Sequence, residues 1–116
     1  MNLNAHQNAF LLDFAKLIVF VDNHDDGMLI TEGEGWRPQE MQQIYFDRGM
    51  SNTLTSNHGR RLAHDLNFIK GGTLITDKAS LKVYGDYWES LSPENRWGGN
   101  FKSFKSGDTG HFERNI

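Results

Sequence analysis

With 116 residues and 37% hydrophobic content, the chain is long enough for one ordinary domain, and we expect residues 1–116 to form a single domain. The net charge of −3 and the scattered basic residues leave no broad basic surface, which argues against nucleic-acid binding. The absence of cysteine excludes a disulfide framework and fits synthesis in a reducing compartment.

The sequence also argues against a membrane protein. Its longest apolar run, residues 17–21, is far too short to cross a bilayer. The first residues lack the basic region of a secretory signal peptide. We therefore expect a protein that is made in the cytoplasm without a signal peptide and has no stable membrane association.

The first predicted element is an amphipathic helix. Apolar residues recur at the spacing of one helical face, namely Phe10, Leu11, Phe14, Leu17, Ile18 and Val21. Asn4 and Gln7 have the pattern of a capping box that begins this helix. Residues 22–27 end it and superficially resemble a calcium loop, but Gly33 stands where the bidentate glutamate belongs. A solvated turn is therefore the preferred interpretation.

A strand and a short helix are predicted next. Residues 28–32 are predicted to form the strand. Because proline is favoured in the first turn of a helix, we expect Pro38 to begin a helix that runs to about Phe46, with Gly49 as its C-terminal cap. Arg37 then lies where the strand gives way to the helix.

Two further strands follow. Residues 62–69 alternate in polarity, which places Asp65 on the polar face of a strand and His64 on the opposite face. A hairpin turn with two glycines leads into a third strand at residues 73–76.

The last third of the chain is predicted to contain a helix and a final strand. The helix covers residues 81–91 and is broken at residues 92–95, before a glycine-rich stretch at residues 97–110. A strand at residues 111–114 would bury Phe112. The elements together indicate an α+β fold, with helices packed against a small antiparallel sheet.

Two of the five histidines are each accompanied by a carboxylate at a useful spacing. His58 precedes Asp65 by seven residues, enough for a loop residue and a strand residue to meet at one ion. Asp108 precedes His111 by three residues, close enough for a general base beside the same ion. Catalytic zinc sites take three protein ligands of these types, whereas structural sites are usually closed by four, mostly cysteines. The sequence therefore indicates one catalytic zinc ion.

The other histidines are assigned no role. His6 and His24 have no matching carboxylate motif and are interpreted as surface or hydrogen-bonded core residues. His64 adjoins Asp65 but lies on the opposite face of its strand, which argues against a metal contact.

Several motifs in order carry a family resemblance. They are Gly35-Trp36-Arg37-Pro38, Ser56-x-His58, Ala63-x-Asp65 and Asp108-x-x-His111-Phe112-Glu113. Together they resemble the zinc D-Ala-D-Ala carboxypeptidase and dipeptidase family, and most of all its phage endolysin branch, which cuts the L-alanyl-D-glutamate bond of peptidoglycan stem peptides. Further matches are Gln42 or Gln43, Gly49 and Trp97-Gly98-Gly99. The resemblance covers residues 28–112 and implies the zinc DD-peptidase/hedgehog-like fold.

The resemblance implies a role for each site residue. His58, Asp65 and His111 would bind one zinc ion, and Asp108 would be the general base. Arg37 would stabilise the oxyanion, because preorganised charge beside the metal offsets the charge of the tetrahedral intermediate. Ser56 would help to position the substrate.

Each role has a structural alternative. Arg37 could instead form a surface ion pair with a nearby glutamate, Glu32, Glu34 or Glu40. Asp108 could be a turn residue, and Ser56 could form a cap or a loop hydrogen bond. Glu113 either orients a zinc-binding histidine or is an exposed strand residue. The chain also departs from the family at Arg61, where members usually carry glycine.

The implied function is hydrolysis of peptidoglycan stem peptides by a monomeric phage-type lysin, at the L-Ala-D-Glu bond. Such a lysin would need a holin-type, membrane-permeabilising partner to reach the cell wall. One alternative is a D-Ala-D-Ala carboxypeptidase or dipeptidase. Another is a non-catalytic zinc domain that binds wall peptides or a protein partner, although such a domain would not need Asp108 and Arg37.

Overall fold

The computed structural model describes residues 1–25, 27–102 and 107–116. Residue 26 of the predicted turn and residues 103–106 of the predicted glycine-rich stretch lie outside this description. The elements in chain order are α1 (Leu3–His24), β1 (Met28–Glu32), α2 (Gln39–Asp47), β2 (Ala63–Lys70), β3 (Thr73–Ile75), α3 (Lys78–Ser90), β4 (Asn95–Trp97), the 3-10 turn η1 (Gly98–Asn100) and β5 (His111–Arg114). The predicted α+β class is confirmed.

The sheet is antiparallel, and β2 is its central strand. Its order is β1-β2-β5-β4, while β3 also pairs with β2. The second half of β2 pairs with β1 and β3, and its first half pairs with β5. In the β2–β5 register, Asp65 lies directly opposite His111. Two residues that are far apart in the sequence therefore share one point of the sheet.

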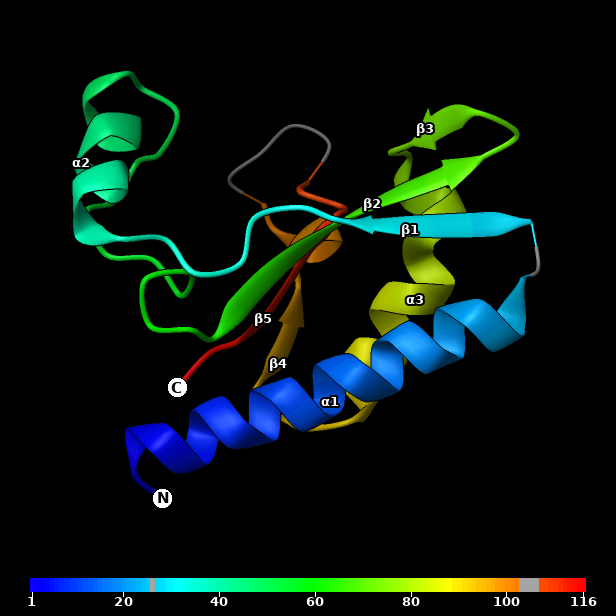
Figure 1. The fold of residues 1–116 in the computed structure, drawn as a ribbon, viewed down its shortest axis with the longest axis horizontal. Coiled ribbons are helices and arrows are strands. Elements are labelled where there is room, and N and C mark those ends of the chain that lie inside the picture. The colour runs from blue at the N-terminus through cyan, green and yellow to red at the C-terminus, as the bar shows by residue number, and fades with distance from the viewer. Residues whose placement is uncertain (26, 103–106) are drawn as a thin grey trace.

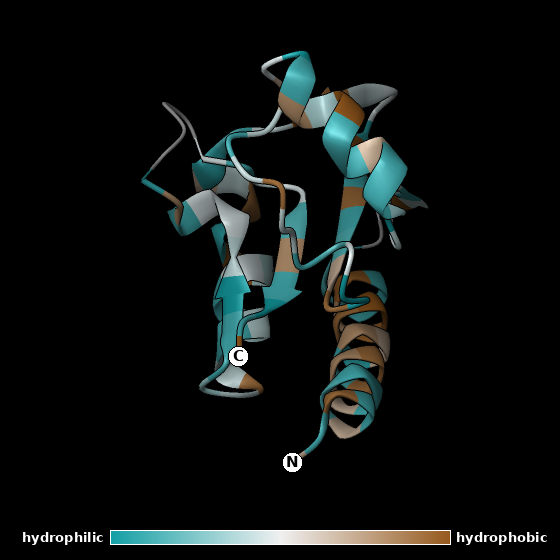
Figure 2. Ribbon diagram, turned by 90° about the vertical axis from the view of Figure 1, so that its left-hand side faces the viewer, coloured by the Kyte–Doolittle hydropathy of each residue, from teal (hydrophilic) through white to brown (hydrophobic). Residues whose placement is uncertain are grey.

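Helices α1 and α3 pack beside the sheet, and the helices and the strands together form the apolar core (Figure 1). The core cluster contains Phe10, Phe14, Leu17, Val21, Met28, Leu62, Leu66, Phe68, Leu81, Tyr84, Trp88, Trp97 and Phe112. Hydrophobic residues run along the length of α1 (Figure 2). No helix in the described part of the chain is long and apolar enough to cross a membrane.

The buried face of α1 is narrower than predicted. Leu11 and Ile18 were expected on that face, but their exposed fractions are 64% and 39%. Each follows a buried residue directly, and one residue turns a helix by about 100°. Side chains at these positions therefore point past the sheet.

The helix ends differ from the predictions by a few residues. Asn2 caps α1, because its side chain accepts a hydrogen bond from the backbone nitrogen of Ala5 at 2.8 Å. Asn4 and Gln7 do bond to each other, but within the first turns of the helix. Helix α3 begins three residues before the predicted start, because Asp77 caps it. Strand β4 was not predicted.

Residues 33–61, here called the α2 arm, connect β1 to β2. The arm projects away from α1 and α3 (Figures 1 and 2). Among the described residues, none of the core cluster comes from the arm. Gln42 is the buried residue of α2, and its amide nitrogen donates to Ser51 Oγ at 3.0 Å and to the Thr53 carbonyl at 2.7 Å. Polar contacts rather than apolar packing therefore hold the arm together.

Candidate metal centre

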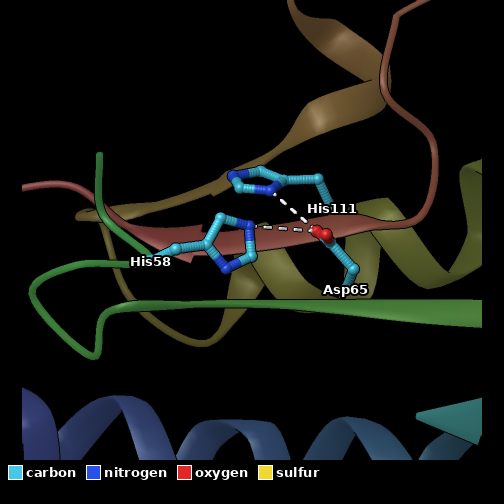
Figure 3. A group of neighbouring side chains, drawn as sticks. All are labelled: His58, Asp65 and His111. Carbon is cyan, nitrogen blue, oxygen red and sulfur yellow. Dashed lines mark hydrogen bonds and ion pairs between the residues drawn. The ribbon is translucent and has the colours of Figure 1, made fainter. Parts of the chain in front are cut away.

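His58, Asp65 and His111 converge on one point (Figure 3). Asp65 Oδ1 lies 3.3 Å from His58 Nε2 and 3.0 Å from His111 Nδ1. One ligand atom from each residue lies within 4.8 Å of the other two. Ligand bonds of about 2.0–2.2 Å in a tetrahedral zinc site separate the ligand atoms by about 3.4 Å. The cluster therefore has the dimensions of a site for one ion.

Both histidine rings are fixed by a second partner. His58 Nδ1 donates to the Gly35 carbonyl at 2.7 Å, which leaves Nε2 to face Asp65. His111 Nε2 donates to Glu113 Oε1 at 2.7 Å, which leaves Nδ1 to face the same carboxylate. Histidines that bind a metal use their second nitrogen in this way, with a carbonyl or a carboxylate as partner. The donor set and its supports fit a zinc ion.

The electrostatics of the cluster favour a cation. Burial alone would raise the pKa of Asp65, but hydrogen bonds from His111 and His58 outweigh it and hold this pKa well below its usual range. Burial would lower the pKa of His111, whereas its bonds to Asp65 and Glu113 raise it to about 9. Burial would raise the pKa of Glu113, but the bonds from His111 and Arg96 lower it. Both carboxylates are therefore ionised near neutral pH.

Asp108 lies beside the cluster without joining it. Its Oδ2 is 4.0 Å from His111 Nδ1, and its side chain is half exposed. The backbone nitrogen of Asp108 donates to the Gly98 carbonyl at 2.8 Å, and a Cβ on Gly98 would lie only 2.1 Å from the Asp108 carbonyl oxygen. Partial burial raises the pKa of Asp108. The Asp108 carboxylate therefore lies next to the cluster with a raised pKa.

Arg37 is held on the arm by three partners. Its guanidinium bonds to Glu34 Oε1 and, at 2.8 Å, to Gln42 Oε1, and it lies 4.6 Å from the centroid of the Tyr45 ring. The ion-pair alternative is therefore observed, with Glu34. The side chain of Arg37 is nevertheless only 12% exposed and lines the same cavity as the cluster. Of the two glutamines, Gln42 is the one that contacts it, while Gln43 bonds to Asp47.

The remaining candidates are also placed. Ser56 lines the cavity, and its Oγ accepts a hydrogen bond from the backbone nitrogen of His58 at 3.2 Å, so the loop bond is present. Glu113 is 5% exposed, so the exposed-strand alternative is wrong. His64 Nε2 lies 3.2 Å from Glu32 Oε1, and its ring stacks on Phe14, away from the cluster as predicted.

Two cavities border Asp65 of the cluster. One, of about 1090 Å³, lies between the α2 arm and β5. The other, of about 920 Å³, runs along β2 and β3 to the start of α3. Both are lined by Asp65, Phe101, Lys102 and Asp108. All three clustered residues line the first cavity, and Asp65 also lines the second.

The family model for D-alanyl-D-alanine carboxypeptidase matches residues 49–114, which include the three clustered residues and Asp108. The chain belongs to the D-alanyl-D-alanine carboxypeptidase family. The family expected from the motifs is thereby confirmed. No curated protein matches the chain.

A solved structure is similar to this chain over most of its length. It is the crystal structure of the L-Ala D-Glu endopeptidase ChiX from Serratia marcescens, with 25% sequence identity and a TM-score of 0.60. The match covers 73% of this chain and 65% of that protein. The chain thus spans slightly less than two thirds of the length of ChiX.

Proposed function

We propose that the chain is a zinc-dependent peptidase that hydrolyses peptidoglycan stem peptides at the L-Ala-D-Glu bond. The observation that carries the proposal is the convergence of His58, Asp65 and His111 in a cleft that Asp108 and Arg37 also line. Membership of the family and the likeness to an L-Ala D-Glu endopeptidase support it.

The three clustered residues would hold one zinc ion. Two imidazoles and a carboxylate are a typical donor set for catalytic zinc, and their separations are of the right size. A bound zinc ion would act as a Lewis acid on the substrate carbonyl and lower the pKa of water.

Asp108 would move the proton. Its Oδ2 would accept a proton from the attacking water and deliver it to the amine nitrogen as the peptide C–N bond breaks. Its raised pKa suits a group that must both take and return a proton.

Arg37 would face the negative charge that develops on the carbonyl oxygen. Because Glu34, Gln42 and Tyr45 already hold its guanidinium, little reorganisation is needed when that charge appears. Ser56 would position the substrate from the wall of the same cavity.

The choice of bond is supported by the two cavities. An endopeptidase must accommodate peptide on both sides of the bond it cuts, and Asp65 of the cluster and Asp108 line both cavities. The second candidate is a D-Ala-D-Ala carboxypeptidase or dipeptidase, which the description of the family favours.

The experiment combines zinc analysis with product identification. Purified protein with zinc is incubated with stem peptides, and mass spectrometry shows which bond is cut. Cleavage between L-Ala and D-Glu supports the proposal, whereas release of D-Ala supports the second candidate. Binding of zinc and stem peptide without cleavage would indicate a non-catalytic domain. Protein that neither binds zinc nor cleaves would refute all three.

Two variants test the assigned roles. We expect Asp108→Ala to retain zinc and lose turnover, because Asp108 lies outside the ligand set. We expect His58→Ala to lose both zinc and turnover. His24→Ala is the matched control, since His24 packs against Phe20 far from the cluster in sequence and should leave both properties unchanged. Full activity of Asp108→Ala would contradict its assignment as the base.

We also propose a phage-type endolysin that acts as a monomer and reaches the wall after holin-type release from the cytoplasm. The proposal rests on the motif resemblance described above. Lysis of cells expressing the protein should then require a coexpressed membrane-permeabilising protein. Lysis without such a partner would contradict it, and size-exclusion chromatography would test the monomer.

A further inference from the structure

We propose that Arg96 is a positioning residue that acts through Glu113 on the metal-binding ring of His111. The inference rests on the proposed zinc site. Arg96 on β4 lies directly opposite Glu113 on β5 in the sheet register. Its Nε and Nη2 donate to Glu113 Oε2 at 2.9 and 2.6 Å. Both bonds go to one oxygen, so they hold Oε2 beside β4 and leave Oε1 for His111.

The two oxygens of Glu113 serve different halves of the site. Oε1 accepts from His111 Nε2, and Oε2 accepts from Asn57 Nδ2 at 3.0 Å as well as from Arg96. Asn57 directly precedes His58, so a single carboxylate links both imidazole ligands. Because Glu113 is 5% exposed, bulk water cannot readily replace a lost partner.

Arg96 also contacts Phe101, a second side chain that lies against the His111 ring. Its guanidinium carbon lies 5.2 Å from the centroid of the Phe101 ring, which in turn lies 5.5 Å from that of His111. Arg96 therefore contacts two side chains that lie against the His111 ring, Glu113 through hydrogen bonds and Phe101 through its tilted ring, and we expect the hydrogen bonds to Glu113 to carry the effect on zinc. Loss of Arg96 leaves Oε2 with Asn57 alone among these donors and removes the cation from the Phe101 face.

A direct role in substrate binding is the competing explanation. The side chain of Arg96 is 51% exposed, and it lines the cavity between the arm and β5. An exposed guanidinium in a cleft can meet a carboxylate of the substrate. The two roles differ in what they affect, because only the positioning role changes zinc affinity.

The test measures zinc affinity by competition with a chromophoric chelator. We expect Arg96→Gln to weaken zinc binding about tenfold, at the low end of the effects of outer-shell substitutions. Arg96→Lys should lie between the wild type and Arg96→Gln, because one ammonium cannot replace both bonds. Because Arg96 acts through Glu113, the double variant Arg96→Gln/Glu113→Gln should bind zinc with the same affinity as Glu113→Gln alone. Arg48→Gln, on the exposed end of α2, is the matched control and should bind zinc like the wild type.

Three results would overturn the inference. They are unchanged zinc affinity in Arg96→Gln, a further loss in the double variant, and a raised KM with unchanged zinc affinity, which would assign Arg96 to the substrate. If Arg96→Gln does not fold, Arg96→Lys carries the test: weaker zinc binding than the wild type supports the inference, and equal binding overturns it. A wild-type protein that binds no zinc would instead refute the proposed function.

Discussion

Arg61 has a left-handed backbone conformation, which glycine adopts more readily. Its φ is +58°, a positive value that no other non-glycine residue has in the described part of the chain. Its guanidinium carbon lies 4.5 Å from the centroid of the Trp36 ring, in a cation–π contact. The effect of the backbone conformation on stability can therefore be measured apart from the effect of the side chain.

The comparison of Arg61→Gly with Arg61→Ala isolates the stability cost of the left-handed backbone conformation. Both variants lose the cation–π contact, so its contribution cancels. The left-handed conformation costs an L-residue about 1–2 kcal/mol, which glycine avoids. Glycine loses about 0.4–1 kcal/mol through the greater freedom of its unfolded chain. The difference predicts that Arg61→Gly is more stable than Arg61→Ala by about 1 kcal/mol.

The assay is reversible denaturation of both metal-free variants by urea and by heat. A difference of 1 kcal/mol corresponds to about 4 °C in Tm for a chain of this length. The same pair of substitutions at Arg60, which has no positive φ, should give the opposite order, with alanine the more stable. If Arg61→Ala is as stable as Arg61→Gly, the strain at Arg61 is refuted.

Two further predictions concern packing and the metal. Gly85→Ala should destabilise the protein by about 1–3 kcal/mol, because the new Cβ would lie 2.1 Å from Cδ2 of the fully buried Trp97. Helix propensity alone predicts the opposite, so a rise in the denaturation midpoint would contradict this prediction. Removal of zinc by a chelator should lower the Tm, since zinc at a hundredfold its Kd adds about 2.7 kcal/mol. Readdition of zinc should restore the Tm of the wild type but not that of His58→Ala, and calorimetry would measure both.

The sequence predicted the part of the site that lies in local motifs. Asp65 and His111 each lie at an alternating position of a strand, so their faces could be read from polarity. The long-range pairing of β2 with β5 then places them opposite each other, and this pairing is not encoded by either strand alone. The sequence pattern could name both candidate ligands, but only the register shows that they meet.

The contacts around Glu113 could not be predicted for a related reason. Arg96 lies on β4, a strand of three residues, and so short a segment gives no clear alternation. Its partner depends on the β4–β5 register. Similarly, the motif left Gln42 and Gln43 equivalent, and only the direction of α2 toward Arg37 distinguishes them.

The α2 arm carries Arg37 and His58 but contributes nothing to the apolar core cluster. Regions with few buried apolar contacts open at lower free energy than the whole molecule unfolds. We therefore expect the α2 arm, which forms one wall of the cleft, to open locally at a lower free energy than the sheet with its two helices. Substitutions at the outer part of the arm, for example at Tyr45 or Met50, which line the cleft, should then change the shape of the cleft more than the global stability.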